Sequence, residues 1–181
     1  MLCLASTLVP QWSNAKEITL NEFIKLIPQW ETPKGSHTTI IGDDGHAYGL
    51  YQITKIMVDD FNRISGNQVA HVVAFDPLFS ARIAKTVLSH YSRQILEAGE
   101  TPNTDHWLYI WNGGGSAWKR VNSPIRDQKQ TNLELYKSRA DYIINTYKNE
   151  QTERKSKEET QIRQRWTHRS WAEVLQLKDW F

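Results

Sequence analysis

The chain has 181 residues and a mass of 21.1 kDa, which fits one domain or one domain with a tail. No apolar run approaches the roughly 20 residues of a membrane-spanning helix, so the sequence excludes an integral membrane protein. The net charge of +2 is too small to indicate nucleic acid as a partner. The single cysteine, Cys3, excludes an intramolecular disulfide and zinc sites built on cysteine pairs.

Residues 1–15 carry two alternative interpretations. An apolar stretch, Leu2 to Val9, precedes Ser13-Asn14-Ala15, which has the small-x-small pattern of a signal-peptidase site. The positively charged segment that normally opens a secretion signal is missing. A signal peptide and an N-terminal arm of the folded protein therefore both stay open.

The first predicted helix begins near residue 19. Thr19 and Glu22 form a capping-box pattern, and apolar residues follow at helical spacing on one face. Pro28 lacks a backbone donor, so we expect it to bend or end this helix. Glu31 should then lie at or just past the C-terminus of the helix, beside Trp30.

A small β-wing is predicted next. Two short apolar runs, residues 38–41 and 47–53, flank the turn cluster Gly42-Asp43-Asp44-Gly45. This order is typical of a hairpin.

The rest of the domain reads as helices. A helical period restarts at Ile53 and stops at Gly66, and Asp76-Pro77 marks the start of a long helix that ends at Gly99. A short helix is expected over His106–Trp111, broken by the loop 112–115, and a last long helix over 133–147. The sequence thus predicts a mainly α (α+β) domain over residues 16–148.

The composition changes after this domain. Residues 148–181 hold eight Lys/Arg and six Asp/Glu and so carry the whole net charge. The run 149–165 has one large apolar residue, Ile162, and reads as a solvated helix or linker. A short amphipathic, Trp-containing end follows over residues 166–181, and we expect this end to dock on the domain or on a protein partner. Residues 149–181 together form a charged helical extension.

Several common chemistries find no support in the sequence. The six histidines show no ligand spacing, the run Gly113–Gly115 is not a phosphate-binding loop, and no nucleophile elbow exists. We therefore expect neither a metal nor a cofactor. What remains is Glu31 in an aromatic setting, where burial would raise the pKa of its carboxyl and suit it to general acid catalysis. The alternative is an ordinary solvent-facing glutamate.

An ordered set of short segments carries a family resemblance. Glu31-Thr32, the stretch 42–53 ending in Gly49-Leu50-Tyr51-Gln52-Ile53, Trp111-Asn112-Gly113-Gly114, and Tyr136 follow one another. This order resembles the lysozyme-like superfamily, and within it the soluble lytic transglycosylases, over residues 18–147. Three positions depart from the pattern of that family: Thr32 replaces Ser, Trp111 replaces the frequent Tyr, and Pro28 interrupts the helix.

The resemblance implies a lysozyme-like fold in which Glu31 is the catalytic acid. In the transglycosylases this residue protonates the glycosidic oxygen between the amino sugars of peptidoglycan and then acts as base, so that the sugar closes an anhydro ring. Hydrolytic relatives add a second carboxylate and water. Asp43 is the candidate here, because invertebrate-type lysozymes carry an Asp shortly before a similar segment. The alternative is that Asp43 only serves the turn.

The resemblance also implies six substrate-binding residues: Gly49, Tyr51, Gln52, Trp111, Asn112 and Tyr136. A glycine would let the sugar approach the backbone, a glutamine offers donor and acceptor, and the aromatic residues offer apolar walls. Core packing is the alternative role for each aromatic residue.

Three hypotheses for function follow. The first is a lytic transglycosylase that binds a peptidoglycan strand and uses Glu31 alone. The second is a muramidase-type hydrolase that uses Glu31 with Asp43. The third is a non-catalytic wall-binding or assembly protein with a partner on residues 149–181. All three predict a periplasmic or secreted protein, including one delivered to the cell wall by a virus or a secretion apparatus.

Overall fold

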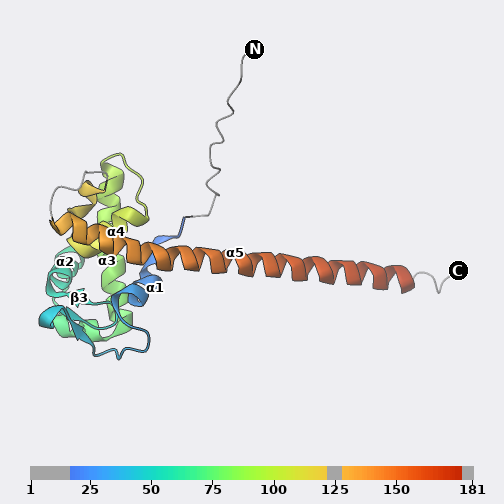
Figure 1. Ribbon diagram of the computed structural model, residues 1–181, viewed down its shortest axis with the longest axis horizontal. Coiled ribbons are helices and arrows are strands. Elements are labelled where there is room, and N and C mark those ends of the chain that lie inside the picture. The colour runs from blue at the N-terminus through green and yellow to red at the C-terminus, as the bar shows by residue number, and fades with distance from the viewer. Residues whose placement is uncertain (1–16, 122–127, 177–181) are drawn as a thin grey trace, which may run out of the picture.

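The computed structural model describes residues 17–121 and 128–176, with side chains over 17–121 and 135–165. This part is mostly helical and holds one small three-stranded antiparallel sheet (Figure 1), which confirms the mainly α (α+β) class. The predicted signal or arm over residues 1–15 lies outside the described residues. The elements are α1 (Leu20–Glu31), β1 (Ile41–Gly42), η1 (Asp43–Gly45), β2 (Ala47–Tyr48), β3 (Ile53–Thr54), α2 (Lys55–Ser65), η2 (His71–Phe75), α3 (Pro77–Glu97), α4 (Thr104–Gly113), η3 (Ala117–Arg120) and α5 (Gln128–Gln176).

Helix α1 begins at the predicted cap but does not end at Pro28. The Thr19 hydroxyl accepts the Glu22 N–H at 3.2 Å, and the Glu22 carboxylate accepts the Thr19 N–H at 2.7 Å, so the capping box is confirmed. The helix continues through Pro28 to Glu31. Proline removes only its own N–H, while its carbonyl still accepts the Thr32 N–H at 3.2 Å and the Thr32 hydroxyl at 3.0 Å.

The β-wing has three strands instead of the two expected from the sequence. Ile41 pairs with Tyr48, and Tyr48 pairs with Ile53. The second apolar run is cut into β2 and β3 by a turn over residues 49–52. Gly49 and Gln52 both have positive φ, +73° and +48°, and the Gln52 N–H donates to the Gly49 carbonyl at 3.0 Å. The predicted continuous strand over 47–53 was wrong for this reason.

The helices behind the wing start and stop largely at the expected residues. Helix α2 ends at Gly66, whose φ is +72°, and Asp76 caps α3 by accepting the Leu78 N–H at 2.8 Å. Helix α4 is longer than expected, because Asn112 and Gly113 still belong to it and the left-handed residue is Gly114.

Helix α1 packs against α3 and α5. Its Phe23 and Trp30 are fully buried, with ring centroids 5.4 Å apart, and Trp107 of α4 lies 5.5 Å from Phe23. Aromatic and aliphatic burial thus holds α1 rigidly. Because Glu31 is the last residue of this helix, its position is fixed by the core.

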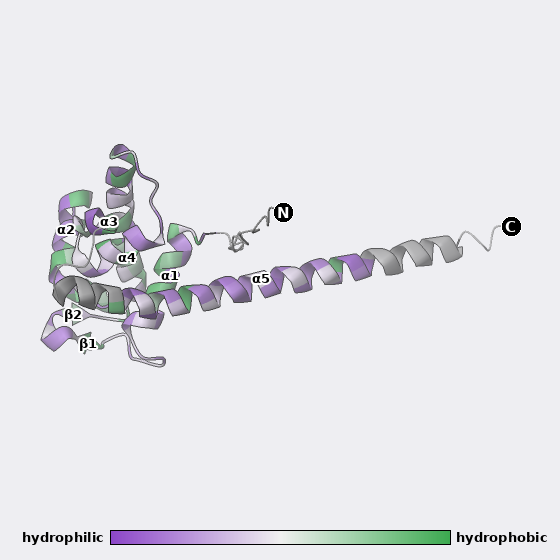
Figure 2. Ribbon diagram, turned by 45° about the horizontal axis from the view of Figure 1, so that its top comes forward, coloured by the Kyte–Doolittle hydropathy of each residue, from purple (hydrophilic) through white to green (hydrophobic). Residues whose placement is uncertain are grey.

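The last helix of the domain and the predicted extension are one continuous helix. Helix α5 packs on the domain through Ala140 and Ile144 and then projects away from it (Figure 1). The expected boundary at 148/149 therefore falls inside a helix and not at a linker. Residues 149–165, except for Gln151, are exposed, and the projecting part is largely hydrophilic (Figure 2). The start of the extension still lies against the domain, since Gln151, Thr152 and Lys155 line a pocket together with Ile18 and Glu22.

No helix in the described ranges is both long enough and apolar enough to cross a membrane.

Candidate active site

The Glu31 carboxylate is half-buried and is bound by residues from two other helices. The indole N–H of Trp111 on α4 donates to Glu31 Oε1 at 2.6 Å. The Tyr136 hydroxyl on α5 donates to the same oxygen. The Trp30 indole N–H in turn donates to the Tyr136 hydroxyl at 2.7 Å. Two donors therefore hold Oε1, and the side chain has one preferred orientation.

Burial raises the pKa of Glu31 above its ordinary value of 4.5, because a desolvated carboxylate loses its favourable interaction with water. The hydrogen bonds from Tyr136 and Trp111, and the positive charge of Arg139, act in the opposite direction without cancelling the effect of burial. Burial, reinforced by the charge of Glu31, also places the pKa of Tyr136 well above 10. Tyr136 therefore stays protonated and remains a donor to Glu31.

Two pockets are lined by residues that neighbour Glu31 in the chain or in space. One has a volume of about 270 Å³ and is lined by Trp111 and Asn112. The other has a volume of about 460 Å³ and is lined by Thr32, Leu50 and Ile143. Glu31 is hydrogen-bonded to Trp111, which lines the first pocket, and it directly precedes Thr32, which lines the second. Each pocket therefore lies next to a direct neighbour of Glu31, although the lining of neither pocket includes Glu31 itself.

The structure brings Trp111, Asn112 and Tyr136 to the region of Glu31, as the sequence predicts. Trp111 is 8% exposed, so it combines core packing with its hydrogen bond to the carboxylate. Asn112 is exposed at the pocket rim. Tyr136 is half-buried and its hydroxyl points at the carboxylate, so it is not simply a core residue.

The predicted binding residues of the wing each have a structural role in the domain. A Cβ on Gly49 would lie 2.0 Å from the Ala74 carbonyl oxygen, so the approach of η2 by itself requires a glycine here, and a substrate contact of Gly49 stays a prediction. Tyr51 is buried in the core, and burial raises its pKa. The Gln52 side-chain amide donates to the Gly49 carbonyl at 2.8 Å. A substrate contact through Gln52 stays a prediction.

Asp43 lies in η1, on the turn between β1 and β2, and is exposed. Its φ is +48° and that of Asp44 is +50°, a conformation that Asp adopts more readily than most residues. Within the described residues its side chain makes no hydrogen bond or ion pair. These observations favour the turn interpretation of Asp43.

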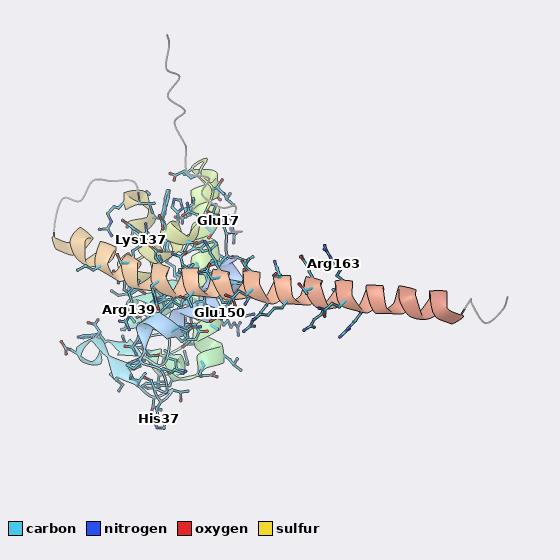
Figure 3. All side chains as sticks on the ribbon, turned by 45° about the vertical axis from the view of Figure 1, so that its right-hand side comes forward. Glu17, His37, Lys137, Arg139, Glu150 and Arg163 are labelled. Carbon is cyan, nitrogen blue, oxygen red and sulfur yellow. The ribbon has the colours of Figure 1, made fainter. Side chains whose placement is uncertain are left out.

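The sequence did not indicate a functional role for two residues near Glu31, Trp30 and Arg139. Trp30 was identified only as an apolar neighbour, but its N–H orients Tyr136. Arg139 lies on the part of α5 that covers the domain, whereas Arg163 lies on the projecting part (Figure 3). Arg139 follows Tyr136 by three residues, which places both on one face of α5. This spacing was the only feature of the sequence that indicated a role for Arg139.

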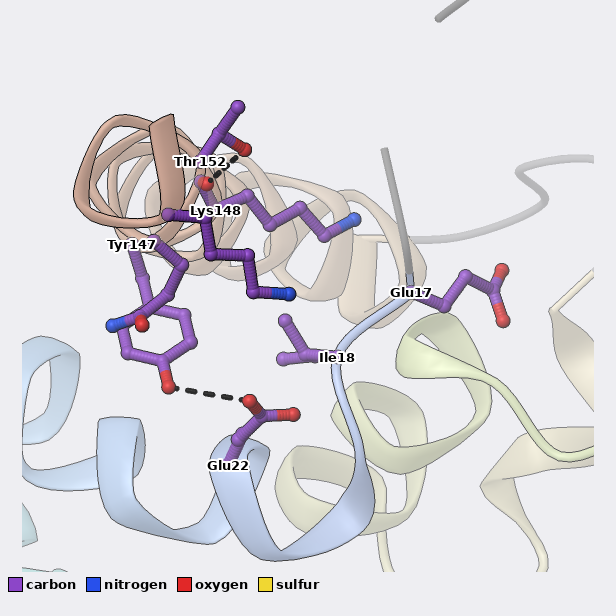
Figure 4. A pocket seen from close by; sticks show the side chains of 8 residues that line it. Glu17, Ile18, Glu22, Tyr147, Lys148 and Thr152 are labelled. Atoms are coloured by element: carbon purple, nitrogen blue, oxygen red, sulfur yellow. Dashed lines mark hydrogen bonds between the residues drawn. The ribbon is translucent and has the colours of Figure 1, made fainter. Parts of the chain in front are cut away.

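A further pocket lies at the opposite end of α1. It has a volume of about 110 Å³ and is lined by Ile18, Glu22, Tyr147 and Lys148 among others. Across it the Tyr147 hydroxyl donates to Glu22 at 3.3 Å (Figure 4). This pocket marks where α5 is attached to the start of α1 and is not part of the site around Glu31.

No cluster of three or more potential metal ligands occurs among the residues that the structure describes. What the site offers is acid–base chemistry through a single carboxyl group of raised pKa.

The chain was compared with family models, curated proteins and solved structures, and none of the three comparisons gives a match.

Proposed function

We propose that the protein is a lytic transglycosylase of lysozyme-like fold that cleaves the bond between N-acetylmuramic acid and N-acetylglucosamine in peptidoglycan. The observation that carries this proposal is Glu31 itself. It is a half-buried carboxyl of raised pKa at the end of a rigid helix, oriented through one oxygen by Trp111 and Tyr136. The ordered set of sequence segments that resembles the soluble lytic transglycosylases supports the same assignment.

The geometry around Glu31 suits a single group that acts first as acid and then as base. Both donors reach Oε1, so the proton of the neutral acid resides on Oε2. Glu31 gives this proton to the glycosidic oxygen as the bond from that oxygen to C1 of the muramic acid breaks. The resulting carboxylate then takes the proton of the C6 hydroxyl, whose oxygen bonds to C1 and closes the anhydro ring. Glu31 ends the cycle protonated, and no water is consumed.

The two donors also serve the second half of this cycle. When Glu31 is ionised, hydrogen bonds from Trp111 and Tyr136 stabilise its negative charge. When it is neutral, Oε1 is a carbonyl-type acceptor for the same donors. The side chain therefore needs no rearrangement between its acid and base roles.

Hydrolysis with Asp43 is the second candidate. It requires a carboxylate that activates water on the other face of the sugar. The exposure of Asp43 and its conformation in the turn give this candidate less support than the single-carboxylate reaction has. The third candidate, a non-catalytic assembly protein, is favoured by one feature, the projecting α5.

The test is mass spectrometry of purified peptidoglycan incubated with the full chain and with Glu31→Gln. We expect anhydro-muropeptides from the unaltered protein and a loss of at least about 100-fold with the variant, the usual contribution of a general acid. The matched control is Glu97→Gln, because Glu97 also ends a helix but is exposed. It should cleave normally.

Each other result assigns a different function. Reducing-end products would identify a hydrolase and would make Asp43→Asn the next variant. Absence of product from the unaltered protein would contradict both enzymatic candidates.

This substrate also determines where the protein acts. Peptidoglycan lies outside the cytoplasmic membrane, so we propose action in the periplasm or outside the cell. Delivery by a virus or secretion apparatus would meet the same requirement.

A further inference from the structure

Trp30 and Glu31 are consecutive residues of α1, and both are hydrogen-bonded to the hydroxyl of Tyr136 on α5. The Trp30 indole N–H donates to the hydroxyl oxygen at 2.7 Å, and the hydroxyl donates to Glu31 Oε1. Trp111 of α4 donates to the same carboxylate oxygen at 2.6 Å. A chain of hydrogen bonds therefore runs from Trp30 through Tyr136 to Glu31, where Trp111 is a second donor.

The first member of this chain determines its direction. An indole nitrogen can donate a hydrogen bond but cannot accept one, whereas a tyrosine hydroxyl can do both. When Trp30 donates to the Tyr136 oxygen, that oxygen serves as an acceptor and its own hydrogen is directed to Glu31. Without Trp30 the bond could run the other way, from a protonated Glu31 to the Tyr136 oxygen.

Trp30 is held in position by the core. Its side chain is 1% exposed, and its ring centroid lies 5.4 Å from that of Phe23 on the same helix. An N–H at this depth cannot replace a lost acceptor with water, so losing the bond to Tyr136 would be costly. The packing of α5 on α1 thus keeps the Tyr136 oxygen within reach of Trp30.

The electrostatics of the site agree with this direction. Burial raises the pKa of Glu31, and the groups that lower it include Trp30 and the charge of Arg139 on α5. Burial likewise raises the pKa of Tyr136, and Trp30 and Arg139 again act in the opposite direction. Trp30 therefore favours the ionised form of Glu31, which the second half of the proposed reaction uses as base.

We propose that Trp30 is a positioning residue for the reaction at Glu31: it fixes the Tyr136 hydroxyl as a donor and so keeps the proton of the neutral acid on Oε2, the oxygen that Tyr136 and Trp111 leave free. Trp30 touches no substrate in this scheme. The inference deepens the proposed function and rests on it for the identity of the reaction. The hydrogen-bond chain itself can be measured without substrate.

The first test measures the pKa of Glu31 by carbon NMR of its side-chain carboxyl in the full chain. Trp30→Phe keeps an aromatic ring against Phe23 but removes the N–H. We expect the pKa of Glu31 to rise, because Tyr136 loses the donor that directs its hydrogen to the carboxylate.

Trp107→Phe is the matched control for this measurement. Trp107 is also buried and lies 5.5 Å from Phe23, but its N–H donates to the Ser92 hydroxyl at 3.0 Å. The control removes a second tryptophan from the same aromatic cluster without touching the chain of bonds to Glu31. It should leave the pKa of Glu31 unchanged.

A double substitution separates positioning from a loosened core. In a Tyr136→Phe background the hydroxyl through which Trp30 acts is gone, so Trp30→Phe should raise the pKa of Glu31 by less than it does when Tyr136 is present. A rise that is equal or larger in this background overturns the proposal. An unchanged pKa in Trp30→Phe itself overturns it as well.

An isosteric replacement decides the question where Trp30→Phe fails to fold. The amino acid 3-benzothienylalanine at position 30 has nearly the shape of tryptophan and carries sulfur in place of the N–H. We expect it to raise the pKa of Glu31 as Trp30→Phe does. An unchanged pKa would overturn the proposal.

Cleavage of peptidoglycan supplies the functional readout. Trp30→Phe should move the alkaline limb of the pH–rate profile to higher pH and lower the rate about five-fold, the usual contribution of one hydrogen bond, whereas Trp107→Phe should leave the limb in place. Failure of the proposed function has a different signature. In that case peptidoglycan stays uncleaved by the unaltered protein, while NMR still shows that the pKa of Glu31 depends on Trp30.

Discussion

At the scale of single residues, the chemistry depends on how strongly Glu31 holds its proton. Burial raises the pKa of this group, whereas the donors Tyr136 and Trp111 and the charge of Arg139 lower it. Each donor can be removed separately. The site is therefore open to a test in which the pH dependence, and not only the rate, is the readout.

Replacing Tyr136 by Phe removes a hydrogen bond that lowers the pKa of Glu31. We expect this pKa to rise further, so the alkaline limb of the pH–rate profile, where the acid loses its proton, should move to higher pH. The cleavage rate should fall about 10- to 100-fold, because Oε1 loses one of its two donors and the base form loses stabilisation. The profile is measured by release of soluble wall fragments.

Tyr142→Phe is the control for this experiment. Tyr142 lies on the same helix and its side chain is 75% exposed. An unchanged profile for both variants would contradict the role given to Tyr136.

The raised pKa of Glu31 also predicts how stability depends on pH. A folded state that binds the proton more tightly than the unfolded chain is favoured at low pH and loses this advantage as the pH rises above 4.5. The free energy of unfolding of the unaltered protein should therefore fall, relative to that of Glu31→Gln, between acidic and neutral pH. Urea titrations of both proteins across this range measure the difference.

Glu97→Gln is again the control, and its difference from the unaltered protein should show no such trend. If Glu31→Gln became relatively less stable toward neutral pH, the native pKa of Glu31 would be lowered, contrary to our assignment.

At the scale of elements, the wing depends on one close backbone approach. At Gly49 a side chain would need a positive φ and would also meet the Ala74 carbonyl of η2. We expect Gly49→Ala to lower the free energy of unfolding by at least about 3 kcal/mol, because strain and overlap combine. Chemical denaturation monitored by tryptophan fluorescence gives the value.

Gly45→Ala separates the two causes. Gly45 also has a positive φ, +95°, but nothing lies within 4 Å of the position of its Cβ. The strain alone should cost about 1 kcal/mol. Equal losses in the two variants would show that the contact with η2 contributes nothing.

Local chemistry made several elements predictable from the sequence. The Thr19–Glu22 cap, the Asp76-Pro77 start and the stop at Gly66 depend on neighbouring residues alone. The two-stranded wing was predicted wrongly because the positive φ of Gln52 arises in a turn that tertiary packing fixes. Pro28 was expected to bend or end α1, but the helix continues through it, because the Pro28 carbonyl still accepts a hydrogen bond from Thr32; Glu31 lies at the C-terminus of the helix, as expected.

The site was only partly predictable for the same reason. Glu31, Trp111 and Tyr136 were selected by the order of short segments, although 105 residues separate Glu31 from Tyr136. The positions of Trp30 and Arg139 relative to Tyr136 and Glu31 depend on which helices pack together. The spacing of residues along the chain does not predict which helices pack against one another.

At the scale of the whole molecule, the compact domain and the projecting helix are separable. Ile144 is buried and Tyr147 contacts Glu22, whereas residues 149–165 are exposed apart from Gln151. We expect a chain ending at Lys148 to keep its melting temperature within about 2 °C and to cleave peptidoglycan at the full rate. Capture of a protein partner, measured by pull-down against the full chain, should be lost.

A second truncation, ending at Leu135, serves as the comparison. It removes Tyr136 and the buried face of α5, so it should abolish cleavage and lower the melting temperature markedly. A chain ending at Lys148 that lost activity would show that the projecting part contributes to the domain.

Because α5 is continuous, a single helix joins the domain to the projecting part of the molecule. An α-helix rises about 1.5 Å per residue, so the 40 residues between Tyr136 and Gln176 span about 60 Å. Tyr136, which orients Glu31, thus lies on the same continuous helix as the far end of the projecting part. A partner bound at that end would set both the distance of the proposed active site from it and the direction in which that site faces. A glycine inserted midway along the arm would release that direction while preserving the tether.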